Sequence, residues 1–516
     1  MEPEQEQELL LLSHQTQFVD IYQQIRRGGG DTNMKSLQNL IVSLRRTIMT
    51  HKTPSVQKAH FTILKLLFKL IVYTRDICGG LGEREIAYSM LFIWKYHFPV
   101  PTAHCLHKIV TSSFGSWRDI KGFCEFIRKH SEKGAEDPFI ETCIGLMNHQ
   151  LNEDARGGDN GISLVSRWIP REGSAHGWLF QRCALQWIRA FRPHYLKTVG
   201  NSEERFIKAF KKGKKEYRLL CTSLSKATDT LQIKQCANQW DTIDPKHIPM
   251  RALSTQQNAL LNIGRNGSTR AETVLSKDRN TCASTFQSFS TSSSSSSCSS
   301  SGEHVFVEMG AVIKLALHNN TSAVRIESLW SLILRQIPNS MSHMIPVLDM
   351  SLFHTDVELF YHALGMALAI ACKGDQKRMI VFDTNAQLVS LSGNLTQMLD
   401  MMKPIFHEHH IGSDLENAFS LYLHEATPAP NDVLVVFCKN KNNKGEGVDM
   451  PSILYWAHSD SKATSFVGYT NNTLSRIAEL PIDTWKLVTP YLFIQYLLSD
   501  KRYDAIDTYF DSILTG

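Results

Sequence analysis

The chain has 516 residues, of which 42% are hydrophobic and 20% are charged, and its formal net charge at pH 7 is +5. A single hydrophobic core stops growing well below this length, so we expect two or more domains. The net charge is too small for a protein that coats nucleic acid over its whole surface, so any basic site must be local.

The cysteine pattern and the first residues indicate a reducing compartment. The eleven cysteines are scattered and include no Cys-x-x-Cys pair, which argues against a zinc ribbon and a small disulfide scaffold. The N-terminus is acidic and lacks the positive region of a signal peptide. No stretch approaches the ~20 apolar residues that cross a bilayer. We therefore expect a cytoplasmic location, or the host cytoplasm or virion if the source is viral, and no membrane partner.

An N-terminal extension, residues 1–35, precedes a long helical region. From about residue 36 to 261, apolar residues recur at three- and four-residue spacing between short Gly, Pro and Ser breaks. This pattern predicts antiparallel helix pairs that form an irregular α-solenoid of HEAT-like helical repeats. A further helix near 324–337 is expected to close this domain, which then covers 36–337.

A segment rich in Ser, Thr, Asn and Gly interrupts the helical domain at about 265–302. Such a composition buries too little apolar surface to offset the entropy of folding. We therefore predict a disordered insertion there.

Residues 338–516 show a different pattern, in which short apolar runs of strand length alternate with helical patterns. The helical patterns are 357–371 and 415–423, and the apolar runs are 344–348, 378–382, 433–437 and 453–456. This alternation predicts a mostly parallel, doubly wound α/β sheet that is covered on both faces. Ligands of such sheets bind at the carboxyl ends of the strands, which is where Asp349 falls.

Asp349 opens a loop that also carries hydroxyl groups. Oxygen ligands at the spacing Asp-x-Ser-x-Ser suit a hard cation such as Mg²⁺. Asp349 and Ser351 fill the first two places, but the last one is occupied by Phe353. The motif therefore lacks one hydroxyl ligand.

Motifs along most of the chain follow one another in a recognisable order. In the N-terminal half they are RDICGGLGERE (75–85), FGSWRD (114–119), SRWIPRE (166–172), YR (217–218), WDTI (240–243) and IPM (248–250). In the C-terminal half they are VLDMS (347–351), IGSD (411–414) and ILYW (453–456). These motifs resemble an uncharacterised family of plants and large DNA viruses, related in architecture to the TROVE module of the Ro autoantigen and carrying a von Willebrand factor A-like domain.

The resemblance implies a helical-repeat ring or horseshoe that binds RNA, joined to a C-terminal A-like domain. It also implies the ligands of a Mg²⁺ site in the second domain, namely Asp349, Ser351, Ser413 and Asp414. Lys439, just after the run 433–437, would repel a cation. We therefore favour a degenerate site without a cofactor, in which Asp349 accepts hydrogen bonds from loop N–H groups or pairs with Lys439.

The segment 205–218 carries the strongest signal for nucleic-acid binding, with seven cations against one acid and three aromatic residues among them. Dense cations neutralise phosphates, and aromatic rings stack on bases. The alternative is a solvated helix face with Phe206 and Phe210 in the core, and the residues alone do not separate the two. The resemblance favours RNA, with the candidate contacts Lys208, Lys211, Lys212, Lys214, Lys215 and Arg218.

Further candidate RNA contacts are the arginines near Gly breaks and helix ends, namely Arg118, Arg167 and Arg171. A guanidinium group can hold a phosphate through two hydrogen bonds. These arginines, together with Arg75 and Arg84, could instead cap helices or pair with nearby acidic residues, and we favour that role for most of them.

The chain lacks the motifs of familiar enzymes. No Gly-x-Ser-x-Gly, His-Glu-x-x-His or Walker sequence is present, so we expect neither catalysis nor a small-molecule substrate. The histidine clusters at 104–107 and 407–410 have no distal partner pair at zinc spacing. The first hypothesis is a non-enzymatic RNA-binding or ribonucleoprotein scaffold with protein contacts through the A-like domain. The second is a protein-interaction or structural scaffold, for example of a large DNA virus, that binds no RNA.

Overall fold

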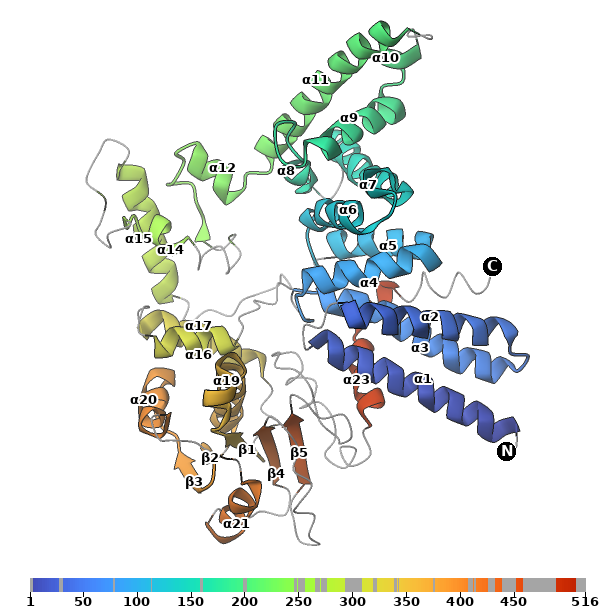
Figure 1. The fold of residues 1–516 in the computed structure, drawn as a ribbon. Coiled ribbons are helices and arrows are strands. Elements are labelled where there is room, and N and C mark those ends of the chain that lie inside the picture. Colours follow the sequence, from blue (N-terminus) through green and yellow to red (C-terminus); the bar gives the residue numbers. More distant parts are fainter. Residues whose placement is uncertain are drawn as a thin grey trace. The chain divides into compact units, whose positions relative to one another are not determined.

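The computed structural model describes residues 3–26, 31–77, 79–112, 114–157, 161–197, 202–245, 248, 256–264, 270, 276–292, 309–318, 323–337, 341, 343–374, 376–406, 412, 414–425, 432–438, 452–457 and 489–506. Most of these residues are in helices (Figure 1). The chain divides into two units, and each is described by itself. Unit 1 comprises Met1–Tyr73, Cys78–Leu81 and Ser292–Asp504, and unit 2 comprises Thr74–Ile77, Gly82–Thr291 and Ala505–Gly516.

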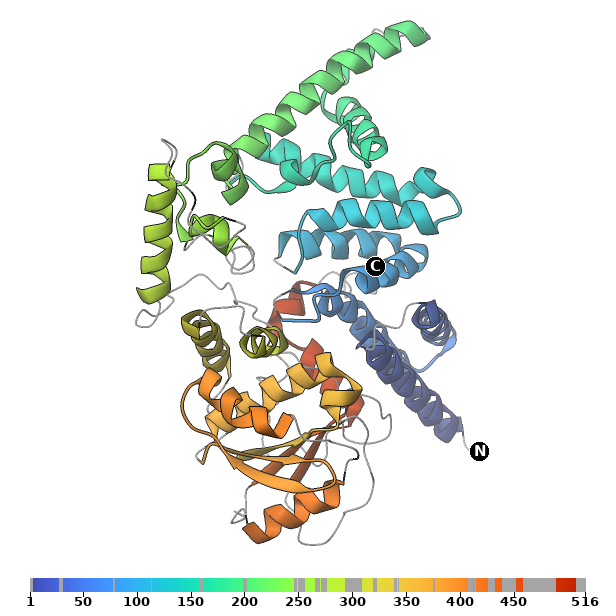
Figure 2. The ribbon, with the colours of Figure 1, turned by 60° about the vertical axis from the view of Figure 1, so that its left-hand side comes forward.

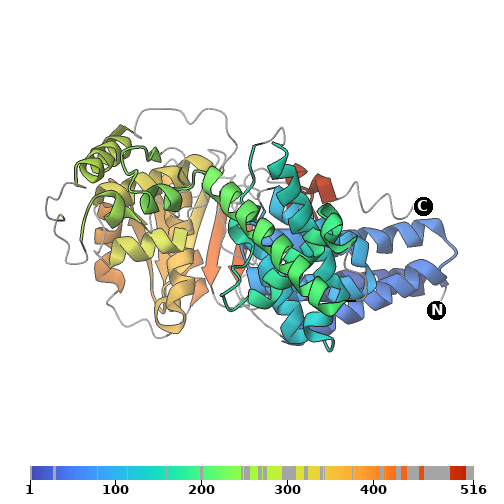
Figure 3. The same ribbon diagram turned by 90° about the horizontal axis from the view of Figure 1, so that it is seen from above.

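The described part of unit 2 is built from helices. The longer ones are α4 (Arg84–His97), α5 (Pro99–Thr111), α6 (Arg118–His130), α7 (Pro138–Ala155), α9 (Gly177–Phe191), α11 (Glu203–Ala227) and α15 (Ser276–Ser292). The short ones are η1 (Gly134–Glu136), α8 (Val165–Trp168), α10 (His194–Lys197), α12 (Leu231–Cys236) and α14 (Gln257–Leu260). From α4 to α10, helices pack on neighbours one or two places along the chain, and the long α11 packs on α7, α8, α9 and α10 (Figure 3). Their apolar faces meet there, as in α6, which buries Ile120, Phe123 and Ile127.

Side-chain caps define where two helices of unit 2 begin. The Asp137 carboxylate accepts a hydrogen bond from the Phe139 N–H at 3.0 Å, and Pro138 takes the first position of α7. The Ser202 hydroxyl likewise accepts from the Arg205 N–H at the start of α11. Each cap satisfies an N–H group that the helix itself leaves without a partner.

The prediction of a disordered insertion over 265–302 is wrong for residues 276–292, which form α15. Cys282 and Phe286, four residues apart, are buried with Trp240, Ile243 and Leu260 in a small apolar cluster. Arg279 adds a contact 4.0 Å from the centre of the Trp240 ring. A few well-spaced apolar residues therefore order this segment despite its polar composition. Residues 293–302 lie outside the described part of the chain.

Unit 1 contains a five-stranded sheet with the order β3-β2-β1-β4-β5. The strands are β1 (Met344–Asp349), β2 (Arg378–Phe382), β3 (Ala386–Ser390), β4 (Val433–Cys438) and β5 (Ser452–Ala457). Strands β2, β1, β4 and β5 pair in parallel, and β3 is an antiparallel edge strand. The four parallel strands confirm the predicted runs, and the helices and sheet together confirm the α plus α/β class. The edge strand β3 was not predicted.

Pro346 lies in the central strand β1, although proline has no N–H to donate to a neighbouring strand. The pairing register explains how it is tolerated. β1 pairs with β4 from Met344 onward, but with β2 only from Val347 onward. Pro346 therefore precedes the residues that pair with β2.

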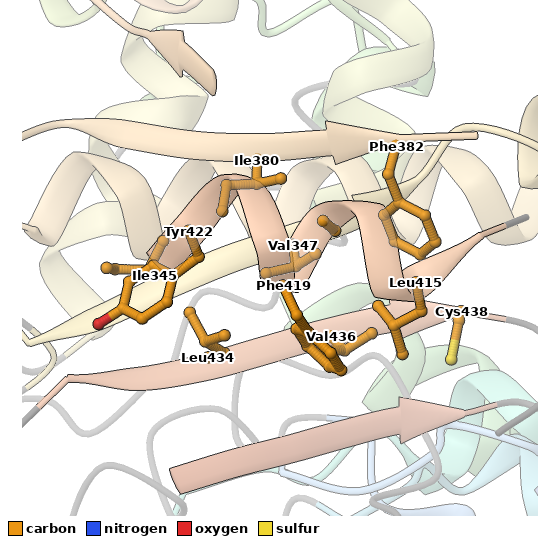
Figure 4. Close-up of a cluster of buried hydrophobic side chains, with 11 residues drawn as sticks. Ile345, Val347, Ile380, Phe382, Leu415, Phe419, Tyr422, Leu434, Val436 and Cys438 are labelled. Carbon is orange, nitrogen blue, oxygen red and sulfur yellow. The ribbon is translucent and has the colours of Figure 1, made fainter. Parts of the chain in front are cut away.

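Helices cover both faces of the sheet (Figure 2). On one face, α19 (Val357–Lys373) packs on β1 and β2. Around α19 lie α16 (Met309–Leu317), α17 (Ala323–Gln336), α18 (Leu352–Thr355) and α20 (Leu395–Phe406). On the other face, Phe419 and Tyr422 of α21 (Leu415–Glu425) pack with Val347 and Val436 in the core shown in Figure 4. All six residues of β1 are buried, as expected for a strand between two layers of helices.

The N-terminal helices also belong to unit 1. They are α1 (Pro3–Arg26), α2 (Asp31–Thr50) and most of α3 (Pro54–Arg75), and α1 packs on α2 and on α23 (Pro490–Leu498), which precedes η5 (Lys501–Tyr503). Unit 1 thus includes residues 1–73 and the predicted helix near 324–337, α17, which packs on α19 and α20. Among the described residues, no helix combines the length and apolarity needed to cross a membrane.

Candidate nucleic-acid interface

The candidate interface of unit 2 rests on a buried carboxylate. Asp119, at the start of α6, is fully buried and accepts hydrogen bonds from Arg75 Nη2 at 2.7 Å, Arg84 Nε at 3.0 Å and the Tyr88 hydroxyl at 2.8 Å. The Ser116 N–H donates a fourth bond at 2.7 Å. The network joins residues that lie far apart in the sequence. Arg75 and Arg84 therefore have the acid-pairing role that we favoured for them.

The network shifts the pKa of its members. Burial alone would raise the pKa of Asp119, but the hydrogen bond and charge of Arg75, with the bonds from Ser116 and Tyr88, outweigh it, so that pKa is lowered. Burial and the adjacent Asp119 carboxylate raise the pKa of Tyr88. Asp119 is thus held as an anion and Tyr88 as a neutral hydrogen-bond donor.

A pocket of about 290 Å³, here called the Arg118 pocket, lies beside this network and is lined by α4, α6 and a residue that precedes α9. Its charged or titratable lining residues are Arg84, Glu85, Arg118, Lys121, Glu125, Lys129, His130 and His176. Arg118, Lys121, Glu125 and Lys129 of α6 recur at three- and four-residue spacing, so they share one helix face. Tyr88, Gly122 and Phe126 complete the lining.

Gly122 is required for the shape of the Arg118 pocket. A Cβ atom at this position would lie 2.5 Å from the Tyr88 hydroxyl oxygen, which is closer than any real contact. Any larger residue would therefore displace the ring that donates to Asp119. The missing side chain lets Tyr88 pack directly on α6.

Of the two carboxylates that line the Arg118 pocket, Glu125 is paired with cations. Glu125 receives two bonds from Arg128, at 2.7 and 3.1 Å, and lies 3.5 Å from His176 Nδ1. Lys129 lies 3.9 Å from the same carboxylate. Arg118 and Lys121 have no carboxylate partner among the described residues. The pocket thus holds two cations that form no ion pair with a described carboxylate.

Three cations gather around the Trp168 ring, and we call this group the Trp168 cluster. Lys121 lies 5.5 Å, Arg118 5.7 Å and Arg167 5.8 Å from the ring centre. Burial lowers the pKa of Lys121, and the charge of Arg118 lowers it further. An anion bound here would relieve that repulsion, and the ring would offer a base a surface for stacking.

The predicted basic segment lies on α11. Lys208, Lys211, Lys212 and Lys215 are exposed and have no carboxylate partner among the residues that the structure describes. Lys214 Nζ lies 2.6 Å from Glu172 Oε1, and Arg218 lies 3.2 Å from Oε2 of the same residue. Two of the six predicted cations are therefore already paired, and their charge contributes less to binding an external anion.

Phe206 and Phe210 of α11 are half-buried, with their rings stacked at 6.1 Å. They are neither enclosed in a core nor fully free to stack on bases. Lys214 lies 5.5 Å from the Phe210 ring. These two rings therefore do not decide between the two interpretations of the basic segment.

The structure brings together some predicted arginines and not others. Arg118 and Arg167 meet at Trp168, whereas Arg171 is exposed and does not line the pocket. Lys121 and Trp168 were not predicted. The three-residue spacing from Arg118 could have indicated Lys121, but nothing in the local sequence places Trp168 beside it.

The predicted cation site belongs to unit 1. The Asp349 carboxylate is 2% exposed and accepts a hydrogen bond from the Ser351 N–H at 2.9 Å. This loop N–H is the partner that we favoured for Asp349 in place of an ion. Phe353 contacts Phe360 and Phe406, with ring centres 5.1 and 5.9 Å away.

The remaining predicted ligands do not complete a site. Asp414 is exposed, and its carboxylate accepts hydrogen bonds from the Glu416 N–H and the Asn417 side chain. Ser413 and Lys439 lie outside the described residues. In the part of the chain that is described, no three His, Cys, Asp or Glu side chains converge as metal ligands. The geometry there fits hydrogen-bonded carboxylates, and the degenerate site without a cofactor stays a prediction.

Comparison with known proteins gives one distant similarity. No family model matches the chain. An uncharacterized protein of Acanthamoeba polyphaga mimivirus is 22% identical over 204 residues, which are 38% of this chain and 32% of that protein. The chain thus matches about a third of the length of its viral relative. No solved structure matches.

Proposed function

We propose that this chain is a non-enzymatic RNA-binding scaffold that holds RNA on unit 2. The Trp168 cluster carries the proposal. Its cations, Arg118, Lys121 and Arg167, surround an aromatic ring, and none of them pairs with a carboxylate among the described residues. Single-stranded RNA needs this combination of cations for its phosphates and rings for its bases. The exposed lysines of α11 supply further cations on unit 2.

Under the same proposal, unit 2 is an irregular α-solenoid related to the TROVE module. The sheet of unit 1 is a von Willebrand factor A-like domain that braces the scaffold or binds protein. Its parallel strands, antiparallel edge and two helical layers support that assignment. The similarity to a mimivirus protein is compatible with a viral relative and does not bear on these two assignments.

The binding test uses the purified full chain and fluorescently labelled single-stranded RNA. We expect an affinity that falls with salt, with a log–log slope that drops by about 0.7 for each phosphate contact removed. The double variant Arg118→Glu/Lys121→Glu should weaken binding by more than about tenfold, because each reversal replaces an attraction with a repulsion.

The matched control is Lys133→Glu/Arg156→Glu, which makes the same change in net charge at exposed residues outside the Trp168 cluster and the α11 surface. It should change the affinity little. RNA binding that is undetectable at low salt would refute the proposal, and so would an equal loss in the control.

A second candidate function is protein binding without RNA. It is favoured by the segment 349–353, here called the cation loop. There Asp349 accepts a hydrogen bond from the Ser351 N–H, and Phe353 packs in an aromatic group. A partner captured equally well with Mg²⁺ and with a chelator would support it. Capture that requires Mg²⁺ and is abolished by Asp349→Ala would count against this metal-independent mode.

A further inference from the structure

The Arg118 pocket differs from the rest of the candidate interface because it is a concave site with several cations in its lining. Tyr88, which packs against Gly122, belongs to its lining and bonds to the buried Asp119. Its lining thus joins a hydrogen-bonded network of unit 2 to a group of cations that an anion can reach.

The Arg118 pocket carries more positive charge than the single negative charge of a phosphodiester would neutralise. Four permanent cations line it, Arg84, Arg118, Lys121 and Lys129, against the carboxylates Glu85 and Glu125. Arg84 shares the Asp119 carboxylate with Arg75, so its charge is only partly balanced, and Arg128, outside the lining, pairs with Glu125. A phosphodiester carries one negative charge, whereas a phosphate monoester carries about 1.5 to 2 at neutral pH.

The size of the Arg118 pocket points in the same direction. A volume of about 290 Å³ lies near the lower end of the range for small-molecule sites, so it suits one terminal group and no folded segment. Arg118 and Lys121 belong both to this lining and to the Trp168 cluster. A nucleotide whose phosphate entered the pocket would therefore have an aromatic ring near its base.

We propose that the Arg118 pocket binds the terminal phosphate monoester of an RNA strand. Arg118, Lys121 and Lys129 donate hydrogen bonds to its oxygens, and the Trp168 ring stacks with the terminal base. This inference rests on the proposed RNA binding and adds to it a preference for a phosphorylated end. The Trp168 ring beside Arg118 and Lys121 favours RNA over a phosphorylated peptide, whose terminal group has no base to stack.

The test compares RNAs of one sequence that carry a 5′-phosphate, a 3′-phosphate or no terminal phosphate, with the label placed internally. We expect the full chain to bind one phosphorylated form about tenfold more tightly than the unphosphorylated RNA, as a charge-assisted pair of hydrogen bonds would give. The 5′ and 3′ arms identify which end is bound. A nucleoside monophosphate should abolish the difference in affinity between phosphorylated and unphosphorylated RNA at a lower concentration than inorganic phosphate does, since it also offers a base.

Two sets of variants separate the pocket from the general surface. Lys121→Met and Lys129→Met should bring the ratio of the affinities for phosphorylated and unphosphorylated RNA towards one. Lys211→Met, an exposed residue of α11, should weaken both RNAs alike and leave the ratio unchanged. Circular dichroism and thermal unfolding of each variant check that it is folded.

The outcomes distinguish this inference from the proposed function. Salt-dependent RNA binding with equal affinities for all three ends would overturn the inference and leave the function standing. An absence of any RNA binding would refute both. Tighter binding of a phosphoserine peptide than of phosphorylated RNA would overturn the inference by assigning the pocket to protein recognition.

Discussion

At the scale of single residues, Asp119 is the position on which most of the candidate interface depends. Its carboxylate satisfies Arg75, which is only 2% exposed, together with Arg84 and Tyr88. Removing one partner of a buried ion pair is costly because the other charge is left without compensation.

We expect Asp119→Ala to destabilise the protein by about 3 to 5 kcal/mol, since it leaves the buried Arg75 guanidinium unpaired. Denaturant unfolding followed by circular dichroism measures this change. Glu153→Ala is a suitable control because the Glu153–Arg156 pair is exposed, and such pairs contribute little. A loss as small as that of the control would show that the network does not hold the fold.

Acid should weaken the same network. Because the folded pKa of Asp119 is lowered below its ordinary value of 3.8, its contribution to stability is fully present above that value. The contribution is lost as the pH falls through the lowered folded pKa. Asp137, whose pKa is also lowered because its bonds to Lys95, Ser131 and Phe139 outweigh the effect of burial, adds to the effect.

The free energy of unfolding should therefore decrease as the pH is lowered from about 6 to about 3. The fall should be shallower in Asp119→Asn, which cannot titrate at that position. Equal slopes in the two proteins would contradict the assignment.

At the scale of elements, a buried histidine pair joins α1 and α3 within unit 1. His14 Nε2 lies 2.8 Å from the Ser43 hydroxyl of α2, and the His14 and His60 rings are 5.1 Å apart, edge to face. Both side chains are almost fully buried. Burial, and then the neighbouring His60, lowers the pKa of His14 to about 4.

This pair should make the N-terminal helices sensitive to mild acid. The folded state keeps His14 neutral, whereas the unfolded chain takes up a proton near its ordinary value of 6.5. Stability is thus fully present above about pH 6.5 and falls as the pH drops towards 4. The Tm should decrease by several degrees over that window, and His14→Gln should reduce the decrease. An unchanged pH profile in the variant would exclude His14 as the cause.

The elements also show which parts of the fold can be read from the sequence. The four parallel strands were predicted because each is a short, continuous apolar run, which is typical of a strand buried on both faces. β3 was missed because its residues are half-buried or exposed and carry no such run. α15 was missed because its composition hides two apolar residues that are buried only through tertiary contacts.

The candidate site was harder to predict than the fold. The lysines of α11 are contiguous in the sequence, so their density was visible. The Arg118 pocket instead combines Arg84, Lys121 and His176 from separate segments, and only the packing of α4 and α6 brings them together. Local sequence also could not indicate that Glu172 pairs with Lys214 and Arg218.

At the scale of the whole molecule, the cation loop determines how the protein should respond to metal. Asp349 already accepts a hydrogen bond from the Ser351 N–H, and Asp414 accepts bonds from Glu416 and Asn417 at the start of α21, so an ion would have to replace those bonds. We expect millimolar Mg²⁺ or Mn²⁺ to leave the Tm of the full chain unchanged and to release no measurable heat in titration calorimetry. A saturable Tm increase that is absent in Asp349→Asn would show a working site.

The shared carboxylate of Asp119 also has an evolutionary consequence. Two arginines depend on one acid, so losing the acid alone is costly, whereas replacing Asp119 and the buried Arg75 together by apolar residues removes both charges at once. Substitutions at these two positions should therefore be correlated among homologous chains. Few homologous chains should lack an acid at position 119 and still keep arginine at position 75.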